Sequence, residues 1–185
     1  MQPDLSRNGP SVTARRGLAS ALWRMAQLRW REPAARRALS SAALERLEGR
    51  IAASERRHTG QIRVVVETSL PWSYVRRHAP VRERALTLFG KYRVWDTEHN
   101  NGVLIYLLMP ERAIEIVADR GLARHIGATE WKAVVAGMAA RFQAGAFEDG
   151  LADAVDAVSL PLAQWFPRAE GTDVPNELPD RPVVR

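Results

Sequence analysis

The chain has 185 residues, of which 46% are hydrophobic and 26% are charged, and it contains no cysteine. This length and composition are those of a globular protein with one main domain. The lack of cysteine excludes disulfides, zinc fingers, thiol catalysis and cysteine-bound iron–sulfur clusters.

The net charge of +6 is concentrated at the N-terminal end of the chain. Residues 1–31 contain six arginines and one acidic residue, so they carry +5 and the rest is nearly neutral. A domain that binds nucleic acid needs basic residues on its folded surface, and we therefore expect no nucleic-acid partner. The basic end leaves open a contact with an anionic partner.

The N-terminal end is predicted to have two parts. Residues 1–11 are expected to be disordered, and residues 12–31 form a predicted basic amphipathic helix with apolar side chains along one stripe. Two interpretations of this helix remain open: it binds an anionic membrane surface or a partner, or it packs on the domain behind it. The residues predicted to make the membrane or partner contact are Arg15, Arg16, Trp23, Arg24, Trp30 and Arg31.

The rest of the chain alternates between helical and strand patterns until a proline-rich end. Helices are recognised by apolar residues on one face, and strands by alternation or by short apolar runs. The predicted elements are a helix at 42–58 with Ser41 as its N-cap, a strand at 61–69, a helix at 80–89, strands at 102–109 and 113–119, and helices at 129–144 and 146–159. Pro161 is expected to bend or end the last helix, and residues 167–185 are expected to form an extended tail.

This order predicts an α/β fold. A strand–helix–strand unit gives a right-handed parallel crossover, and the turn at residues 110–112 adds an antiparallel hairpin. Helices can then cover both faces of the sheet. We therefore predict a three-layer α/β/α sandwich around a small mixed β-sheet, formed by residues 42–166, with an extra N-terminal helix.

The hairpin also predicts where polar residues gather. Because its turn lies at one end of the sheet, residues 96–102 and 119–121 must lie together at the other end, beside the start of the first strand. Carboxylate and amide oxygens suit Ca²⁺ or Mg²⁺, although a turn with acidic caps would use the same residues. The candidate metal ligands are Asp96, Glu98, Asn100, Asn101 and Asp119, with His99 and Arg120 as neighbours.

Sequence motifs for catalysis are mostly absent. The chain has no GxxxxGK[ST], no GxSxG and no HExxH, and no nucleophile stands beside an obvious general acid or base. These absences favour a binding protein over an enzyme.

Three segments of the chain together resemble the TPM domain. They are Asp96–Ile105 (DTEHNNGVLI), Ile114–Leu122 (IEIVADRGL) and Phe142–Leu151 (FQAGAFEDGL), and the resemblance covers about residues 42–160. The family takes its name from a thylakoid lumen protein, a photosystem II repair factor and a worm acetylcholine-receptor regulator. The resemblance implies an α/β/α sandwich.

The biochemistry that this resemblance implies is varied: acid phosphatases, calcium binders and accessory factors for membrane complexes. The family's loop acids and asparagines fall on Asp96, Asn100, Asn101 and the loop at Asp119. Many relatives have glycine where this chain has Asp119. Many also carry a signal peptide and a membrane anchor, and neither is visible here. We therefore expect a bacterial-type member that is cytoplasmic, with a peripheral place at the inner membrane as an alternative.

The leading hypothesis for function is a non-enzymatic accessory or binding module with a Ca²⁺ or Mg²⁺ site at the rim of the sheet. One alternative is a metal-dependent acid phosphatase. A second is a peripheral assembly factor for a membrane complex. The expected partner is an unknown protein or an anionic membrane surface.

Overall fold

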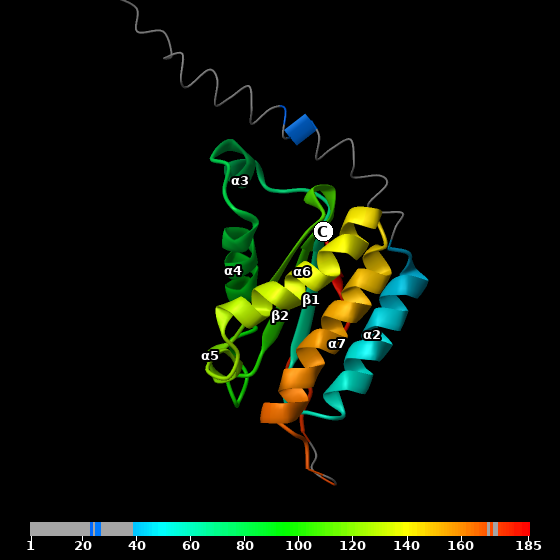
Figure 1. The fold of residues 1–185 in the computed structure, drawn as a ribbon, viewed down its shortest axis with the longest axis vertical. Coiled ribbons are helices and arrows are strands. Elements are labelled where there is room, and N and C mark those ends of the chain that lie inside the picture. The colour runs from blue at the N-terminus through cyan, green and yellow to red at the C-terminus, as the bar shows by residue number, and fades with distance from the viewer. Residues whose placement is uncertain (1–22, 24, 27–38, 170, 172–173) are drawn as a thin grey trace, which may run out of the picture.

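The computed structural model describes residues 23, 25–26, 39–169, 171 and 174–185. Its centre is a four-stranded sheet with the order β3-β2-β1-β4 (Figure 1). Strand β1 pairs in parallel with β2 and β4, whereas β2 and β3 form an antiparallel hairpin. The mixed sheet is therefore confirmed. The strands are β1 (Ile62–Glu67), β2 (Val103–Leu108), β3 (Ala113–Ala118) and β4 (Val183–Val184).

Helices cover both faces of the sheet, which confirms the three-layer sandwich (Figure 1). Two separate hydrophobic cores lie between the layers, one on each face. The first core is covered by α2 (Ser41–Glu55), α6 (Ala128–Ala144) and α7 (Phe147–Trp165), and the second by α3 (Trp72–Arg76) and α4 (Val81–Lys91). The short helix α5 (Arg120–Ala123) follows β3.

The alternation of side chains along the strands divides them between the two cores. In β2, Val103, Ile105 and Leu107 enter the first core, and Leu104 and Tyr106 enter the second. Every residue of β1 and β2 is buried, as expected for strands covered on both faces. The apolar run at 102–109 thus contains β2, an inner strand of the sheet, as predicted.

All four predicted helices of the domain differ somewhat from their predicted limits, and two of the differences have a clear cause. The prediction of Ser41 as the N-cap of α2 is wrong by one residue, because the N-cap is Ser40. Helix α2 begins at Ser41 because the Oγ atom of Ser40 accepts a hydrogen bond from the main-chain N–H of Ala43, at 3.2 Å. Helix α7 passes through Pro161 and ends at Trp165. Continuation places Leu162 in the first core, fully buried over Gly60, and this burial offsets part of the cost of a proline within a helix.

The C-terminal segment adds a strand that the sequence pattern does not predict. Val183 and Val184 pair with Val65 and Val66 of β1. Side chains of β1 and its neighbours also hold the segment. The Oε1 atom of Gln61 accepts hydrogen bonds from the main-chain N–H groups of Glu177 and Leu178, both at 3.0 Å. The segment from 174 to 185 is therefore packed on the domain rather than a free extension.

Most of the predicted N-terminal helix lies outside the described residues. The three residues described there, Trp23, Met25 and Ala26, are helical. Met25 packs against the second core, and Trp23 is 66% exposed. Within the part of the chain that the structure describes, no helix is both long and apolar enough to cross a bilayer.

Candidate functional site

The loop before β2 meets the end of β3 at one rim of the sheet, as the hairpin predicts. The main-chain N–H of Asp119 donates to the carbonyl oxygen of Gly102 at 2.9 Å. Two residues further on, the N–H of Gly121 donates to the carbonyl oxygen of Asn100 at 2.8 Å. The start of β1 joins them, because the side-chain amide of Asn101 donates to Thr59 Oγ1 at 3.2 Å. We refer to these loops, residues 96–102 and 119–121, as the rim.

Two glycines allow the rim loops to pack this closely. A Cβ atom on Gly102 would lie 1.9 Å from the carbonyl oxygen of Val94. A Cβ atom on Gly121 would lie 2.5 Å from the carbonyl oxygen of Asn100 and 2.6 Å from that of His99. Both contacts are with main-chain atoms, which cannot rotate away as a side chain can. The loop geometry at the rim therefore requires glycine at these two positions.

Two buried oxygen atoms at the rim have no hydrogen-bond partner among the described residues: Asn101 Oδ1 and Asp119 Oδ2. Asn101 is fully buried, and its main-chain N–H donates to Thr97 Oγ1 at 3.1 Å. Asp119 is 6% exposed, and its Oδ1 atom accepts the N–H of Arg120 at 2.6 Å as the N-cap of α5. A buried oxygen without a partner destabilises a fold by about 1–3 kcal/mol. Either atom could accept a hydrogen bond from water or contact a cation.

The other predicted rim residues lie at the surface. Asp96, Glu98, His99, Asn100 and Arg120 are exposed. Asp96 forms an exposed ion pair with Arg93 at 2.7 Å. Asn100 has a φ of +51°, which asparagine tolerates better than most residues. The rim thus separates into a buried pair, Asn101 and Asp119, and an exposed loop.

The described residues contain no group of three or more histidine, aspartate or glutamate side chains placed to hold a metal ion. A cation at the rim would therefore depend on amide, main-chain and water oxygens as well as on carboxylates. Calcium accepts such mixed oxygen ligands, with six to eight of them in typical sites.

Of the residues predicted for a membrane or partner contact, only Trp23 is described. Its exposed indole is consistent with either a membrane or a protein partner. The other five, Arg15, Arg16, Arg24, Trp30 and Arg31, lie outside the described residues.

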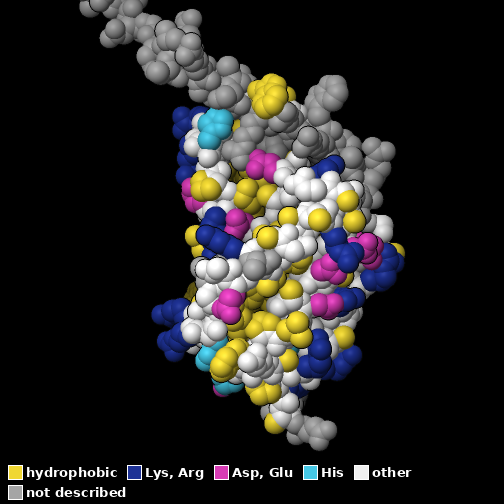
Figure 2. Space-filling view, in the orientation of Figure 1, with side chains coloured by type: hydrophobic (Ala, Val, Ile, Leu, Met, Phe, Trp, Pro, Cys, Tyr) yellow, Lys and Arg dark blue, Asp and Glu magenta, His cyan; other side chains and the backbone are white. Residues whose placement is uncertain are grey.

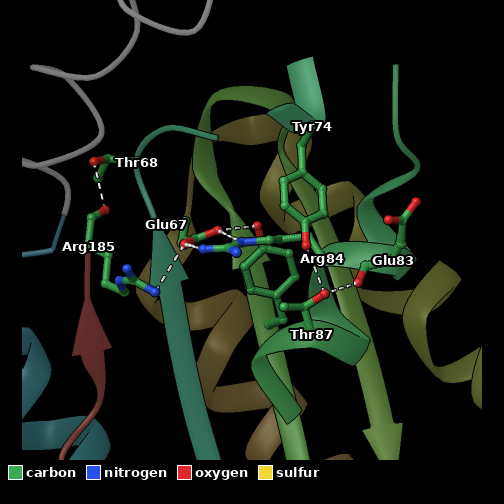
Figure 3. A network of polar contacts seen from close by, with 8 residues as sticks. Glu67, Thr68, Tyr74, Glu83, Arg84, Thr87 and Arg185 are labelled. Carbon is green, nitrogen blue, oxygen red and sulfur yellow. Dashed lines mark hydrogen bonds and ion pairs between the residues drawn. The ribbon is translucent and has the colours of Figure 1, made fainter. Parts of the chain in front are cut away.

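A second polar cluster, which the sequence pattern does not predict, lies at the opposite end of the parallel strands (Figure 3). Glu67, the last residue of β1, forms a buried bidentate ion pair with Arg84 of α4. The hydroxyl of Tyr106 also donates to Glu67, at 2.8 Å, and burial raises the pKa of this tyrosine. Hydrogen bonds to Glu67 raise the pKa of Arg84. The carboxylate is fully engaged, so the cluster fixes α4 on the sheet and leaves no oxygen of Glu67 unpaired.

Buried titratable groups also join α2 to α7 and to β1. The Oγ atom of Ser54 lies 2.8 Å from His58 Nε2 and also contacts Ser159 of α7. His58 Nδ1 lies 3.0 Å from the carbonyl oxygen of Gly60, so Nδ1 carries the proton and Ser54 donates to Nε2. Burial lowers the pKa of His58 to about 4 and raises that of Glu55 to about 8. Ser54, His58 and Ser159 are all buried, so a substrate in solution cannot reach their side chains.

The fold and the rim together define a small α/β/α domain with a loop-built polar site at one end of its sheet. The family model of the TPM domain matches residues 35–159, so the chain belongs to the TPM domain family. The fold is also similar to the NMR structure of the BA42 protein from the psychrophilic bacterium Bizionia argentinensis. That match has 25% sequence identity and a TM-score of 0.68, and it covers 79% of this chain and 94% of the other. Comparison with curated proteins gives no match.

Proposed function

We propose that this TPM-domain protein is a non-enzymatic binding module with a divalent-cation site at the rim. The proposal rests on the two buried, unpartnered oxygens of Asn101 and Asp119, which come from different loops. A hard cation such as Ca²⁺ or Mg²⁺ would satisfy both atoms and join the loop before β2 to the end of β3. Asp96, Glu98 and Asn100 lie on the loop before β2, together with Asn101. They are the candidates to complete the coordination of the cation.

The surroundings of the rim favour binding over catalysis. The hydroxyl–imidazole contact of Ser54 and His58 is buried between α2 and α7, away from solvent. Asp96, which a phosphatase could use as a nucleophile, is exposed and paired with Arg93. A bound cation would instead stabilise one arrangement of the rim loops, which is what a calcium-dependent binding module needs.

An amide chemical-shift titration with Ca²⁺ and with Mg²⁺ tests the cation site. We expect millimolar cation to shift the amide signals of residues 96–102 and 119–121 together. Asp119→Asn removes a carboxylate charge while keeping an oxygen, and it should weaken this binding by about tenfold or more. Asp149→Asn, at an exposed position on α7, is the matched control and should bind as the unmodified protein does. If neither cation shifts the amide signals of either loop, the proposal of a cation site is wrong.

The phosphatase alternative is tested with p-nitrophenyl phosphate in the presence of each cation. We expect poor turnover. Robust cation-dependent hydrolysis that Asp96→Asn abolishes without unfolding the protein would make the phosphatase the better hypothesis.

A further inference from the structure

An apolar groove runs along the outer edge of the sheet, between β3 and α6. Its volume is about 710 Å³. Ile114 and Ile116 of β3 line its floor, and Trp131 and Val135 of α6 line its wall. Figure 2 shows yellow hydrophobic side chains exposed between charged ones on this face of the molecule. The groove is separate from the rim oxygens and is not part of the cation proposal.

The floor of the groove is an edge strand, and its outward main-chain groups can be identified. The N–H of Asp119 donates to the carbonyl oxygen of Gly102, which precedes β2. In an antiparallel pair the hydrogen-bonding direction alternates, so the main-chain groups of residues 117, 115 and 113 also face β2. The N–H and C=O groups of Ile114, Ile116 and Ala118 therefore point away from the sheet. The carbonyl oxygen of Ile116 accepts a hydrogen bond from Arg82 of α4, which agrees with this direction. Among the described residues, no further strand pairs with β3.

Arg82 occupies one of the outward acceptors of β3, the carbonyl oxygen of Ile116, but its side chain forms only weak contacts there. Its side chain is about half exposed, and its ion pair with Glu115 is a surface contact of 3.3 Å. Surface ion pairs of this kind contribute little to stability, so Arg82 can move aside when another donor replaces it at Ile116. A strand laid along β3 brings a main-chain N–H to that carbonyl oxygen.

Charge and hydrogen bonding indicate what such a strand would carry. Lys132 lines the groove and is exposed. The indole nitrogen of Trp131, which also lines the groove, is buried without a partner among the described residues. A second copy of this chain fits less well, because it would bring its own Arg82 to the same edge.

We propose that the outer edge of β3 binds an extended peptide segment of another protein, which pairs with Ile114–Ala118 as a further strand of the sheet. Apolar side chains at alternate positions of the peptide fill the groove below α6, since side chains of a strand alternate between its two faces. An acidic residue of the peptide lies at Lys132. Main-chain pairing provides affinity, and the groove with Lys132 provides specificity.

A synthetic peptide of alternating valine and threonine with one central aspartate tests the pairing on the full chain. We expect millimolar peptide to shift the amide signals of residues 114, 116 and 118 more than those of 113, 115 and 117. N-methylation of the peptide amides that face β3 should abolish binding, whereas methylation of the opposite amides should not. Equal binding of both methylated peptides, or no shift in β3, would overturn the proposal. Binding of decanoate but not of the peptide would instead assign the groove to an apolar carboxylate and equally overturn it.

Two pairs of variants localise the binding. Ala139→Phe fills the groove and should weaken peptide binding by about tenfold or more, while Ala140→Phe, on the exposed side of the same helix, should not. Lys132→Glu should weaken binding of the aspartate peptide but not of an asparagine analogue, and Lys91→Glu on α4 is its control. Equal effects within both pairs would contradict the placement.

Discussion

Glu55, near the end of α2, is a carboxyl group that burial keeps protonated near neutral pH. It is 7% exposed, its Oε1 atom accepts the N–H of Ile62 at 2.8 Å, and burial raises its pKa from 4.5 to about 8. Because folding raises this pKa, the contribution of Glu55 to the free energy of unfolding is fully present below pH 4.5. That contribution is lost as the pH rises to 8.

His58 has the opposite dependence. Burial lowers its pKa from 6.5 to about 4, so its contribution is present above pH 6.5 and is lost as the pH falls to 4. Each group changes the free energy of unfolding by about 1.4 kcal/mol per pH unit within its window. Between pH 4.5 and 6.5 the two slopes oppose each other. From these two groups we expect stability to be nearly constant in that range and to fall between pH 6.5 and 8.

Glu55→Gln should remove the fall in stability above pH 6.5, so that only the pH dependence due to His58 remains. Glutamine keeps an oxygen for the N–H of Ile62 but does not titrate. We expect the free energy of unfolding of this variant to rise by roughly 3 kcal/mol from pH 4 to 6.5 and then to stay level. Urea unfolding at a series of pH values measures this profile. Glu45→Gln, at an exposed position of the same helix, should leave the native profile unchanged, and a persistent fall above pH 6.5 in Glu55→Gln would contradict the assignment.

Among the loops and helices, the rim glycines give the clearest prediction. Gly121→Ala places a Cβ atom 2.5 Å from the carbonyl oxygen of Asn100, so the two loops must separate. We expect a loss of about 2 kcal/mol or more in the free energy of unfolding, with amide shifts at residues 99–101. Gly137→Ala is the control, because its Cβ meets nothing within 4 Å on helix α6. That change should stabilise the protein by about 0.5–1 kcal/mol in the same urea titration. Equal effects of the two changes would show that the rim tolerates looser packing.

The long elements could be predicted from the sequence because their patterns are local. Residues 103–108 form an uninterrupted apolar run, and α6 carries apolar side chains along one face up to Gly145, whose φ is +82°. Helices α3 and α5 have only five and four residues, too few for a period to show. Strand β4 has two residues and depends on contacts with β1, which no local pattern encodes.

The candidate site could be predicted in position but not in detail. The hairpin alone brings Asn101 and Asp119 to one rim. Their burial, in contrast to the exposure of Asp96, depends on how closely the loops pack at Gly102 and Gly121, and such packing is a tertiary property. The cluster at Glu67 was missed for the same reason: its partner Arg84 comes from a helix on the second face of the sheet. A glutamate at the end of a wholly buried strand was the available signal.

For the whole molecule, the uneven distribution of charge gives a testable prediction about binding to anionic membranes. Residues 1–31 carry +5, and the exposed Trp23 lies among them. If this segment binds a membrane, the protein should sediment with anionic vesicles but not with neutral ones. Attraction of about 1 kcal/mol per basic residue near the surface could supply several kcal/mol before ordering costs. Raising the salt to about 1 M should release the protein, because the Debye length falls to about 3 Å.

Deletion of residues 1–31 separates membrane binding from packing on the domain. If the segment binds membranes, we expect the truncated protein to lose vesicle binding, with only a small fall in melting temperature from the loss of the Met25 contact with the second core. A lower melting temperature after deletion, together with no sedimentation of the full chain, would show that the segment packs on the domain instead.

The pairing of β4 with β1 has a consequence for the chain as it is synthesised. Thr68 and Arg185 are hydrogen bonded although they are 117 positions apart. While the chain leaves the ribosome, β1 and β2 can associate early, but the free side of β1 has to wait for residues 183–185 to emerge. During that interval a strand that is apolar except for Arg63 and Glu67 presents unpaired main-chain groups to its surroundings, and such an edge can start aggregation. Arrest of translation just before this segment would therefore leave a nascent domain that depends on chaperones, even though nearly all of its core is already present.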